Sequence, residues 1–220
     1  MRVVIAGGHG KIALLLERML TERRDQAVAL IRNPDQVTEV EATGAEAVVL
    51  DLEAATAAQV AATLDGADAV VFAAGAGPGS GAARKDTVDR AASVLLAEAA
   101  AAAGVRRFVQ ISGMGVDQLP APGTDEVWAA YLTAKAAAEV DLRGRDLDWT
   151  ILRPGGLTDD PPTGKVALAA PPLPRGQVSR ADVAAVILTL LDEPKTSGMT
   201  LDLVAGSTPV GAAAREVAKN

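Results

Sequence analysis

The chain has 220 residues, of which 49% are hydrophobic and 22% charged, a balance typical of a compact globular protein and not of a disordered one. Its formal net charge of -7 argues against general nucleic-acid binding, because an acidic surface repels a phosphate backbone. With no cysteine and only one histidine, His9, disulfides, thiolate metal sites and multi-histidine metal centres are excluded, and no metal is expected.

The first residues argue against export and against membrane insertion. The apolar run at residues 3–6 is too short for a signal peptide and is followed at once by glycines. Further along, no stretch approaches the roughly 20 apolar residues of a membrane span. We therefore expect a cytoplasmic protein with a small-molecule substrate and with no membrane or nucleic-acid partner. The length favours one domain over residues 1–220.

Short apolar runs then alternate with helical stretches. Runs without polar alternation predict strands buried on both faces, at residues 3–5, 27–31, 47–50, 69–73, 105–111, 149–152 and 200–204. Apolar spacing and capping residues predict helices at residues 11–24, from 34 onward, and at 56–64, 82–103, 128–143 and 179–191. Residues 158–177 are irregular and rich in proline, either a lid over a site or a surface loop. The alternation predicts an α/β fold of three layers, a doubly wound parallel sheet with helices on both faces.

A glycine-rich turn joins the first expected strand to the first expected helix. In the spacing Gly7-x-x-Gly10-x-x-Ala13, Gly7 allows the tight turn, Gly10 lets the backbone approach a pyrophosphate, and Ala13 lets the helix sit close to the sheet. The helix N-terminus then offers free N–H groups and the positive end of its dipole to the phosphate. This context favours dinucleotide binding over a merely structural turn. The residues expected at the phosphate are Gly7, His9, Gly10, Lys11 and Ile12.

The end of the second strand indicates the type of dinucleotide. NAD-binding proteins usually place an acidic residue there to accept a hydrogen bond from the ribose 2′-OH, whereas this chain has Arg32 and Asn33. An arginine pairs with a 2′-phosphate, and a carboxylate would repel it. The sequence therefore favours NADP(H), with NAD(H) as the alternative.

Two further strand ends are expected to frame the cofactor, because ligands of such sheets bind at the carboxyl ends of the strands. Asp51 and Leu52 follow the third strand, where a side chain can face the adenine. Small residues follow the fourth strand and let the ribose and pyrophosphate lie close; they are Ala73, Ala74 and Gly75.

A serine, a tyrosine and a lysine form a candidate catalytic set. Tyr131 is the only tyrosine, and Lys135 lies four residues on, a spacing that puts both side chains on one face of a helix. A neighbouring ammonium favours the phenolate, so Tyr131 is expected to move a proton while Lys135 also reaches the nicotinamide ribose. Ser112, after the fifth strand, is expected to hold a substrate carbonyl or hydroxyl. The alternative is a tyrosine packed beside a lysine with no catalytic role.

With these residues in view, the chain resembles the short-chain dehydrogenase/reductase superfamily, in its atypical branch of NAD(P)-binding, NmrA-like and epimerase-like proteins. The resemblance covers nearly the whole chain and implies a Rossmann sheet of about seven strands. Besides the glycine turn and the Tyr131-x-x-x-Lys135 pair, the segments that carry it are Arg32-Asn33-Pro34, Asp51-Leu52, Gln110-Ile111-Ser112, Leu152-Arg153-Pro154-Gly155, Ser179-Arg180-Ala181-Asp182-Val183-Ala184 and the closing strand from Thr200.

The resemblance also implies where the substrate binds. In the family, the stretch after the sixth strand lines the nicotinamide end and leads into a small substrate-pocket region, here about residues 153–178. The residues that this implies at the cofactor are Pro154, Gly155, Gly156 and Leu157. Family likeness further suggests a monomer or a homodimer.

One departure keeps alternatives open. Family members with a full catalytic tetrad carry an asparagine in the helix after the fourth strand, where this chain has Val88-Asp89-Arg90. The favoured function is an NADP(H)-dependent oxidoreductase acting on a small carbonyl- or quinone-like substrate. A non-catalytic NADP(H)-binding redox sensor or regulator is the first alternative. An NAD-dependent epimerase or dehydratase is the second, disfavoured by Arg32 and by the short chain after Leu152.

Overall fold

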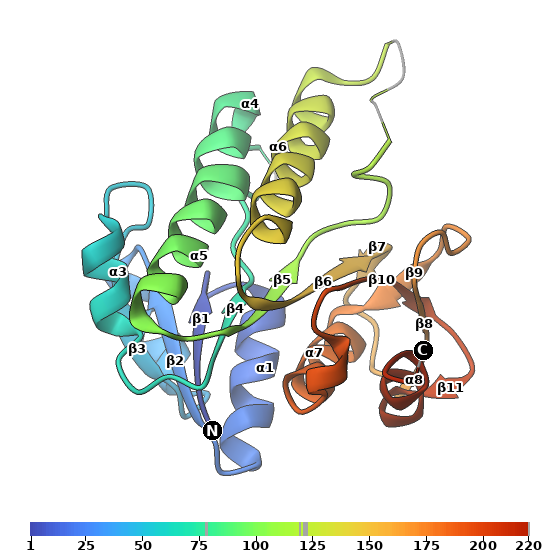
Figure 1. Cartoon of the computed structure of the whole chain (residues 1–220), viewed down its shortest axis with the longest axis horizontal. Coiled ribbons are helices and arrows are strands. Elements are labelled where there is room, and N and C mark those ends of the chain that lie inside the picture. The colour runs from blue at the N-terminus through green and yellow to red at the C-terminus, as the bar shows by residue number, and fades with distance from the viewer. Residues whose placement is uncertain (78, 119, 121–122, 220) are drawn as a thin grey trace.

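The computed structural model describes residues 1–77, 79–118, 120 and 123–219. Within these residues the main sheet has nine strands in the order β11-β8-β10-β6-β5-β4-β1-β2-β3. The run from β10 to β3 is parallel throughout, whereas β8 pairs antiparallel with β10 and with β11. The expected doubly wound parallel sheet of about seven strands is therefore confirmed, with two antiparallel strands added at one edge (Figure 1).

The elements have the following bounds. The strands are β1 (Arg2–Ala6), β2 (Gln26–Ile31), β3 (Glu46–Val49), β4 (Ala69–Phe72), β5 (Arg107–Ile111), β6 (Asp148–Pro154), β7 (Gly156–Thr158), β8 (Lys165–Ala169), β9 (Gln177–Ser179), β10 (Met199–Ala205) and β11 (Thr208–Pro209). The α-helices are α1 (Lys11–Glu22), α2 (Val37–Glu41), α3 (Ala57–Thr63), α4 (Gly81–Arg84), α5 (Ala92–Ala103), α6 (Glu126–Arg143), α7 (Arg180–Leu191) and α8 (Val210–Val217). Three short helical turns are η1 (Pro34–Gln36), η2 (Lys85–Ala91) and η3 (Pro194–Thr196).

Alternate residues of each central strand face two separate apolar cores. In β1, Val3 and Ile5 belong to a core that also contains residues of α1, α7 and α8, whereas Val4 and Ala6 belong to a second core with residues of α3 and α5. All four side chains are fully buried, which explains why the strands are continuous apolar runs. The two helical layers lie on opposite sides of the sheet (Figure 1). No helix in the described part of the chain is long and apolar enough to span a membrane.

Capping residues set several helix ends where the sequence predicted them. The Ser179 hydroxyl accepts a hydrogen bond from the Asp182 N–H at the start of α7. Thr56 and Gln59 form a reciprocal capping box at α3. Gly104 ends α5 in the left-handed conformation, with φ of 72°. The caps at Ser179 and Gly104 are confirmed as predicted, because each depends on neighbouring residues alone, whereas the capping box of α3 was not predicted.

The chain departs from the predicted elements in several places, and one of them is the unpredicted two-stranded sheet of β7 and β9. The proline-rich segment 158–177 was expected to be irregular, but it contains the strand β8. Val166 and Leu168 of this strand are buried. The helix expected at 82–103 is divided into α4, the π-helical turn η2 and α5. The short elements β11 and α8 at the C-terminus were not predicted. For β11, the two residues Thr208–Pro209 are too few to show a strand pattern.

Candidate functional site

The glycine turn after β1 is closely packed against two neighbouring strands. Gly7 has φ of +81°, and a Cβ built on it would lie 2.5 Å from the Ala74 Cα. A Cβ on Gly8 would lie 2.4 Å from the Ala29 Cβ of β2. The N–H groups of both glycines donate to the carbonyl of Leu30. Glycine is therefore required at both positions, and the packing role of Gly8 was missed by the sequence motif.

The helix that follows this turn has an open N-terminus. Gly10 is its N-cap, and no side chain caps it within the described residues. A Cβ on Gly10 would lie 3.2 Å from the carbonyl oxygen of Gly7, so a side chain would crowd the turn. The first N–H groups of an α-helix have no partner inside the helix. This arrangement fits a phosphate group, which accepts from such groups and is attracted by the helix dipole.

A cleft of about 270 Å³ runs from this turn across the carboxyl ends of β1 to β4. It contains most of the residues that the sequence placed at the cofactor, namely Gly7, His9, Gly10, Arg32, Asp51, Leu52, Ala73, Ala74 and Gly75. It also contains residues that the sequence did not place at the cofactor, namely Leu30, Ile31, Gln36, Leu50, Glu53, Arg84, Val88 and Ala92. The cleft therefore joins the glycine turn to the ends of β2, β3 and β4, the part of the sheet where the sequence placed the phosphate and adenosine end of a dinucleotide.

Three predicted cofactor residues are absent from the cleft lining and have other contacts. The Asn33 side chain accepts a hydrogen bond from the Asp35 N–H at η1. The Lys11 ammonium lies 2.6 Å from Asp159 Oδ2, and Arg180 contacts the other oxygen of the same carboxylate at 2.7 Å. Ile12 instead packs against the apolar core. The charge of Lys11 is therefore shared with a carboxylate from the segment after β7.

Arg32 and Arg84 flank one carboxylate at the far end of the cleft. Arg32 Nη1 lies 3.4 Å from Glu53 Oε2, and Arg84 also pairs with this oxygen. The Thr87 hydroxyl donates to the other oxygen of Glu53 at 2.6 Å. The hydrogen bonds from Arg84 and Thr87 hold the pKa of Glu53 below its usual value. Both arginines are thus near a charged carboxylate, which the sequence did not reveal because Glu53 and Arg84 are distant in the chain.

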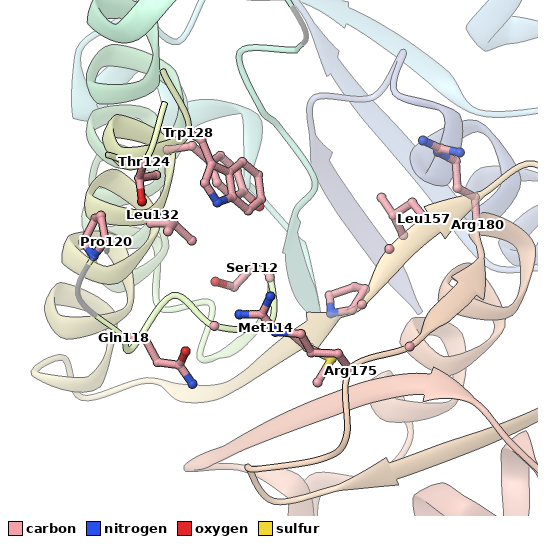
Figure 2. A pocket seen from close by; sticks show the side chains of 17 residues that line it. Ser112, Met114, Gln118, Pro120, Thr124, Trp128, Leu132, Leu157, Arg175 and Arg180 are labelled. Carbon is pink, nitrogen blue, oxygen red and sulfur yellow. The ribbon is translucent and has the colours of Figure 1, made fainter. Parts of the chain in front are cut away.

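A second and larger pocket, of about 760 Å³, lies beyond the ends of β5 and β6. Figure 2 shows side chains from α6, from the loops after β5 and β6 and from the segment before β9 around it. Among its lining residues are Ser112 and Tyr131 and the predicted stretch Pro154, Gly155, Gly156 and Leu157. The structure therefore brings two of the three candidate catalytic residues to one cavity.

Ser112 and Tyr131 approach each other around Gly113. The Ser112 side chain is buried, and its hydroxyl has no hydrogen-bond partner among residues 1–77, 79–118, 120 and 123–219. A Cβ on Gly113 would lie 2.9 Å from the Tyr131 hydroxyl, so any larger residue would collide with the phenol. Trp128 stacks on Tyr131 with ring centroids 4.9 Å apart. A buried, unpartnered hydroxyl beside a pocket is available to a ligand oxygen.

Lys135 is fully engaged by protein groups. Its ammonium donates to the carbonyl of Ile111 at 3.2 Å and to that of Ala74 at 3.5 Å, and lies 3.3 Å from Asp89 Oδ1. The other Asp89 oxygen accepts from the Ala76 N–H. Because an ammonium has three donors, these contacts use all of them. Lys135 therefore ties α6 to the ends of β4 and β5, and a contact with a ribose needs one of these bonds to be exchanged.

The electrostatics of Tyr131 differ from the expectation that Lys135 favours its phenolate. Burial raises the pKa of Tyr131 to about 12, and the charges of Asp89 and Glu139 act in the same direction. Burial likewise lowers the pKa of Lys135, against the opposing effect of Asp89. Lys135 does not lower the pKa of the phenol, because its positive charge is balanced by the carboxylate of Asp89. Tyr131 is therefore a neutral phenol near pH 7, able to donate a proton.

A buried ion pair holds the helix that carries Tyr131. The Arg153 guanidinium of β6 makes two hydrogen bonds to the Glu139 carboxylate of α6, at 2.9 and 2.6 Å. Both side chains are almost completely buried. Arg153 also contacts Asp117, in the loop after β5. Such a bidentate pair fixes the orientation of α6 relative to β6. Arg153 and Glu139 therefore position the wall of the pocket, although neither residue lines it.

Comparisons with known proteins identify the family of the chain. Residues 7–194 match the model of a family described as NAD(P)H-binding. An uncharacterised sugar epimerase, YhfK, of Bacillus subtilis is 36% identical over 218 residues, which cover 99% of this chain and 100% of that protein. A putative NAD-dependent epimerase/dehydratase from Bacillus halodurans is similar in structure, with a TM-score of 0.89, 34% identity and coverage of 98% and 99%. The oxidoreductase ylbE from Lactococcus lactis has a TM-score of 0.87 and 27% identity, over 100% of this chain and 98% of that one.

Proposed function

The chain belongs to the NAD(P)H-binding family, and we propose that it is an NADP(H)-dependent oxidoreductase acting on a small carbonyl- or quinone-like substrate. One observation carries this proposal: the Ser112 hydroxyl, which has no partner among the described residues, and the Tyr131 phenol both line a large pocket, at the same end of the sheet as the glycine-rich cleft. A site that only bound a dinucleotide would need the cleft alone.

The cleft offers a place for each part of the cofactor. The pyrophosphate would lie at Gly7, Gly10 and the N-terminus of α1, which no side chain of the described residues caps. The adenosine end would lie between Arg32 and Leu52, and the nicotinamide end toward Pro154 and Gly155. When bound in its reduced form, the cofactor supplies a hydride.

Preference for NADP(H) follows from the two arginines at the adenosine end. A 2′-phosphate accepts hydrogen bonds from guanidinium groups, and Arg32 is more than half exposed there. Glu53 lies between Arg32 and Arg84, so the phosphate competes with one carboxylate for two cations. The balance of charge still favours the phosphate. Measurement of the dissociation constants of NADPH and NADH tests this preference, and tighter binding of NADH contradicts it.

The chain's own residues then handle the substrate oxygen. The Ser112 hydroxyl donates a hydrogen bond to the carbonyl oxygen and orients it. As hydride adds to the carbonyl carbon and the carbon–oxygen double bond becomes single, the Tyr131 phenol gives its proton to the oxygen. For an aldehyde or ketone substrate this transfer is downhill, because even with a raised pKa a phenol is a far stronger acid than the alcohol formed. The phenolate regains its proton from water.

Two substitutions test these roles. We expect NADPH oxidation with a panel of aldehydes, ketones and quinones to fall by about 10²–10⁴-fold in Tyr131→Phe, the range for loss of a general acid. Ser112→Ala should lower the rate as well, and both variants should keep the wild-type dissociation constant for NADPH. Full activity of Tyr131→Phe on a verified substrate would show that the proton donor is wrongly assigned.

A redox sensor remains the first alternative, and the contacts of Lys135 favour it. Its ammonium is engaged by Asp89 and two carbonyls, an arrangement that suits a fixed scaffold as well as a working site. A sensor would bind NADPH without turnover across the whole panel. It would also change its affinity for a protein partner between the oxidised and the reduced cofactor.

An epimerase or dehydratase is the second alternative, favoured by the names of two similar proteins. Such enzymes retain their cofactor through the catalytic cycle, so the purified protein would contain tightly bound NAD. Release of the bound nucleotide by acid, followed by chromatography, distinguishes this alternative. Recovery of NADP or of no nucleotide would support the oxidoreductase instead.

A further inference from the structure

The charge of the larger pocket is opposite to that of the protein. The chain carries 28 acidic residues and a net charge of -7, yet the described residues that line this pocket include two arginines and no carboxylate. These arginines are Arg175, before β9, and Arg180, at the start of α7. A pocket meant for a neutral substrate gains nothing from two cations, so their placement indicates an anionic ligand.

The two arginines are not equivalent. Arg180 pairs with Asp159 at 2.7 Å, so its charge is partly neutralised. Arg175 makes no hydrogen bond and no ion pair with any other described residue. Figure 2 shows its side chain extending from the segment before β9 into the pocket, on the side where Ser112 lies. An unpaired guanidinium in this position has all its donors available to a ligand.

The opposite wall of the pocket is aromatic and flat. Trp128 stacks on Tyr131 with an angle of 19° between the rings, and its side chain is 53% exposed although it is large and apolar. Met114, Leu132 and Leu157 complete an apolar lining. An exposed indole held in a fixed orientation by a second ring offers a surface on which a planar ligand can stack.

We propose that this pocket takes a planar aromatic or conjugated carbonyl compound that carries an anionic group. The ring system stacks on Trp128, the anion pairs with Arg175, and the carbonyl oxygen lies toward Ser112. A carboxylate or a phosphate ester meets the chemistry of Arg175, because both accept two parallel hydrogen bonds from a guanidinium. This inference rests on the proposed oxidoreductase function and specifies its substrate class.

The test measures binding, so that it does not depend on turnover. Isothermal titration calorimetry of the full chain saturated with NADP⁺ would compare 2-naphthoate, 2-naphthyl phosphate and the neutral 2-naphthamide. We expect at least one of the two anions to bind about 10- to 100-fold more tightly than the amide, the gain from a charge-assisted hydrogen bond. The anion that binds more tightly identifies carboxylate or phosphate as the natural group.

Two variants separate the ring from the charge. Arg175→Gln should reduce the affinity of the anions to that of the amide and leave the amide unchanged. Trp128→Leu should weaken all three ligands by a similar factor, about three- to tenfold. Arg215→Gln, on α8 away from the pocket, removes the same charge and should change nothing.

Equal binding of anions and amide by the wild type would overturn the inference, as would an unchanged anion preference in Arg175→Gln. Failure of the proposed function has a different signature. The wild type would then bind 2-naphthoate or 2-naphthyl phosphate through Arg175 as expected, while no planar anionic carbonyl compound, 4-carboxybenzaldehyde included, was reduced by NADPH.

Discussion

Lys135 and Asp89 form an ion pair that is buried on every side, with 3.3 Å between Nζ and Oδ1 and at most 5% of either side chain exposed. The pair joins α6 to η2, and the other Asp89 oxygen holds the Ala76 N–H of the loop after β4. That loop forms one wall of the dinucleotide cleft, and α6 carries Tyr131. One contact therefore couples the positions of the two halves of the site.

Removal of one partner should destabilise the fold strongly. Asp89→Ala leaves the Lys135 ammonium buried and uncompensated, which should lower the free energy of unfolding by about 3–5 kcal/mol. Asp89→Leu combined with Lys135→Met should restore much of this loss, because it removes both charges. Urea denaturation followed by circular dichroism measures the changes.

The matched control is Asp86→Ala. Asp86 is an exposed carboxylate paired with Arg90 in the same segment, so its loss should lower the free energy of unfolding by about 1 kcal/mol or less. A similar cost at both positions would contradict the role given to the buried pair.

Tyr131 should titrate far above an ordinary tyrosine. It is the only tyrosine of the chain, so the tyrosinate absorbance reports on it alone. The native protein should show a midpoint at a pH of about 12, because burial and the charges of Asp89 and Glu139 raise the pKa of this phenol. The unfolded protein in urea should titrate near pH 10. A native midpoint at or below 10 would show that Lys135 acts on the phenol after all.

The raised pKa of Tyr131 also makes the free energy of unfolding depend on pH. Since the folded-state pKa of Tyr131 is raised above that of the unfolded chain, its neutral form stabilises the fold fully below pH 10. This contribution is lost as the pH rises toward 12. Tyr131→Phe lacks it, so the difference in unfolding free energy between wild type and variant should change between pH 10 and 12 and be constant from pH 7 to 9.

Gly7 should tolerate no larger residue, because a Cβ at this position would collide with Ala74 in addition to straining the backbone. Gly7→Ala places a methyl group 2.5 Å from the Ala74 Cα at a φ of +81°, so β1 and the loop after β4 must separate. We expect loss of measurable NADPH binding and a lower thermal midpoint. Gly66→Ala provides the control, because Gly66 has φ of +67° with nothing within 4 Å of a Cβ. It carries the left-handed strain alone, about 1 kcal/mol, and should bind NADPH normally. Equal effects of the two substitutions would show that the collision with Ala74 is unimportant.

The parts of this molecule that local sequence determines could be predicted, and those that depend on distant residues could not. Strand–helix alternation, the Gly7 turn and the Ser179 cap are each set by residues close in the chain. Their recognition was enough to obtain the parallel sheet and the cleft. By contrast, β8 was missed because its pairing partner β10 lies about 30 residues further on, and its own five residues show only a weak pattern.

The candidate site divides in the same way. Ser112 and Tyr131 were predicted at the site from the residues and their spacing, and the stretch after β6 from the resemblance to a family. The partners that change their chemistry come from elsewhere, as Asp89 does for Lys135 and Glu53 for Arg32. Arg175 gave no signal at all, because a lone arginine in a proline-rich segment is indistinguishable from a surface residue. Only the folded chain shows that it faces a pocket whose described lining residues include no carboxylate.

The selectivity between NADPH and NADH should be under the control of Glu53. Its carboxylate stays charged near pH 7, since Arg84 and Thr87 lower its pKa, and it therefore competes with a 2′-phosphate for Arg32 and Arg84. Glu53→Gln should release both guanidinium groups and tighten NADPH binding by about tenfold, while NADH binding changes by less than about twofold. Arg32→Ala should weaken the binding of NADPH.

Glu98→Gln on α5 removes the same charge from an exposed position and serves as the control. Fluorescence titration of both cofactors, repeated at high salt to screen the long-range charge, measures the change. If Glu53→Gln strengthened NADH and NADPH equally, the carboxylate would act on the whole cleft and not on a 2′-phosphate, and the assignment of Arg32 to that phosphate would be wrong.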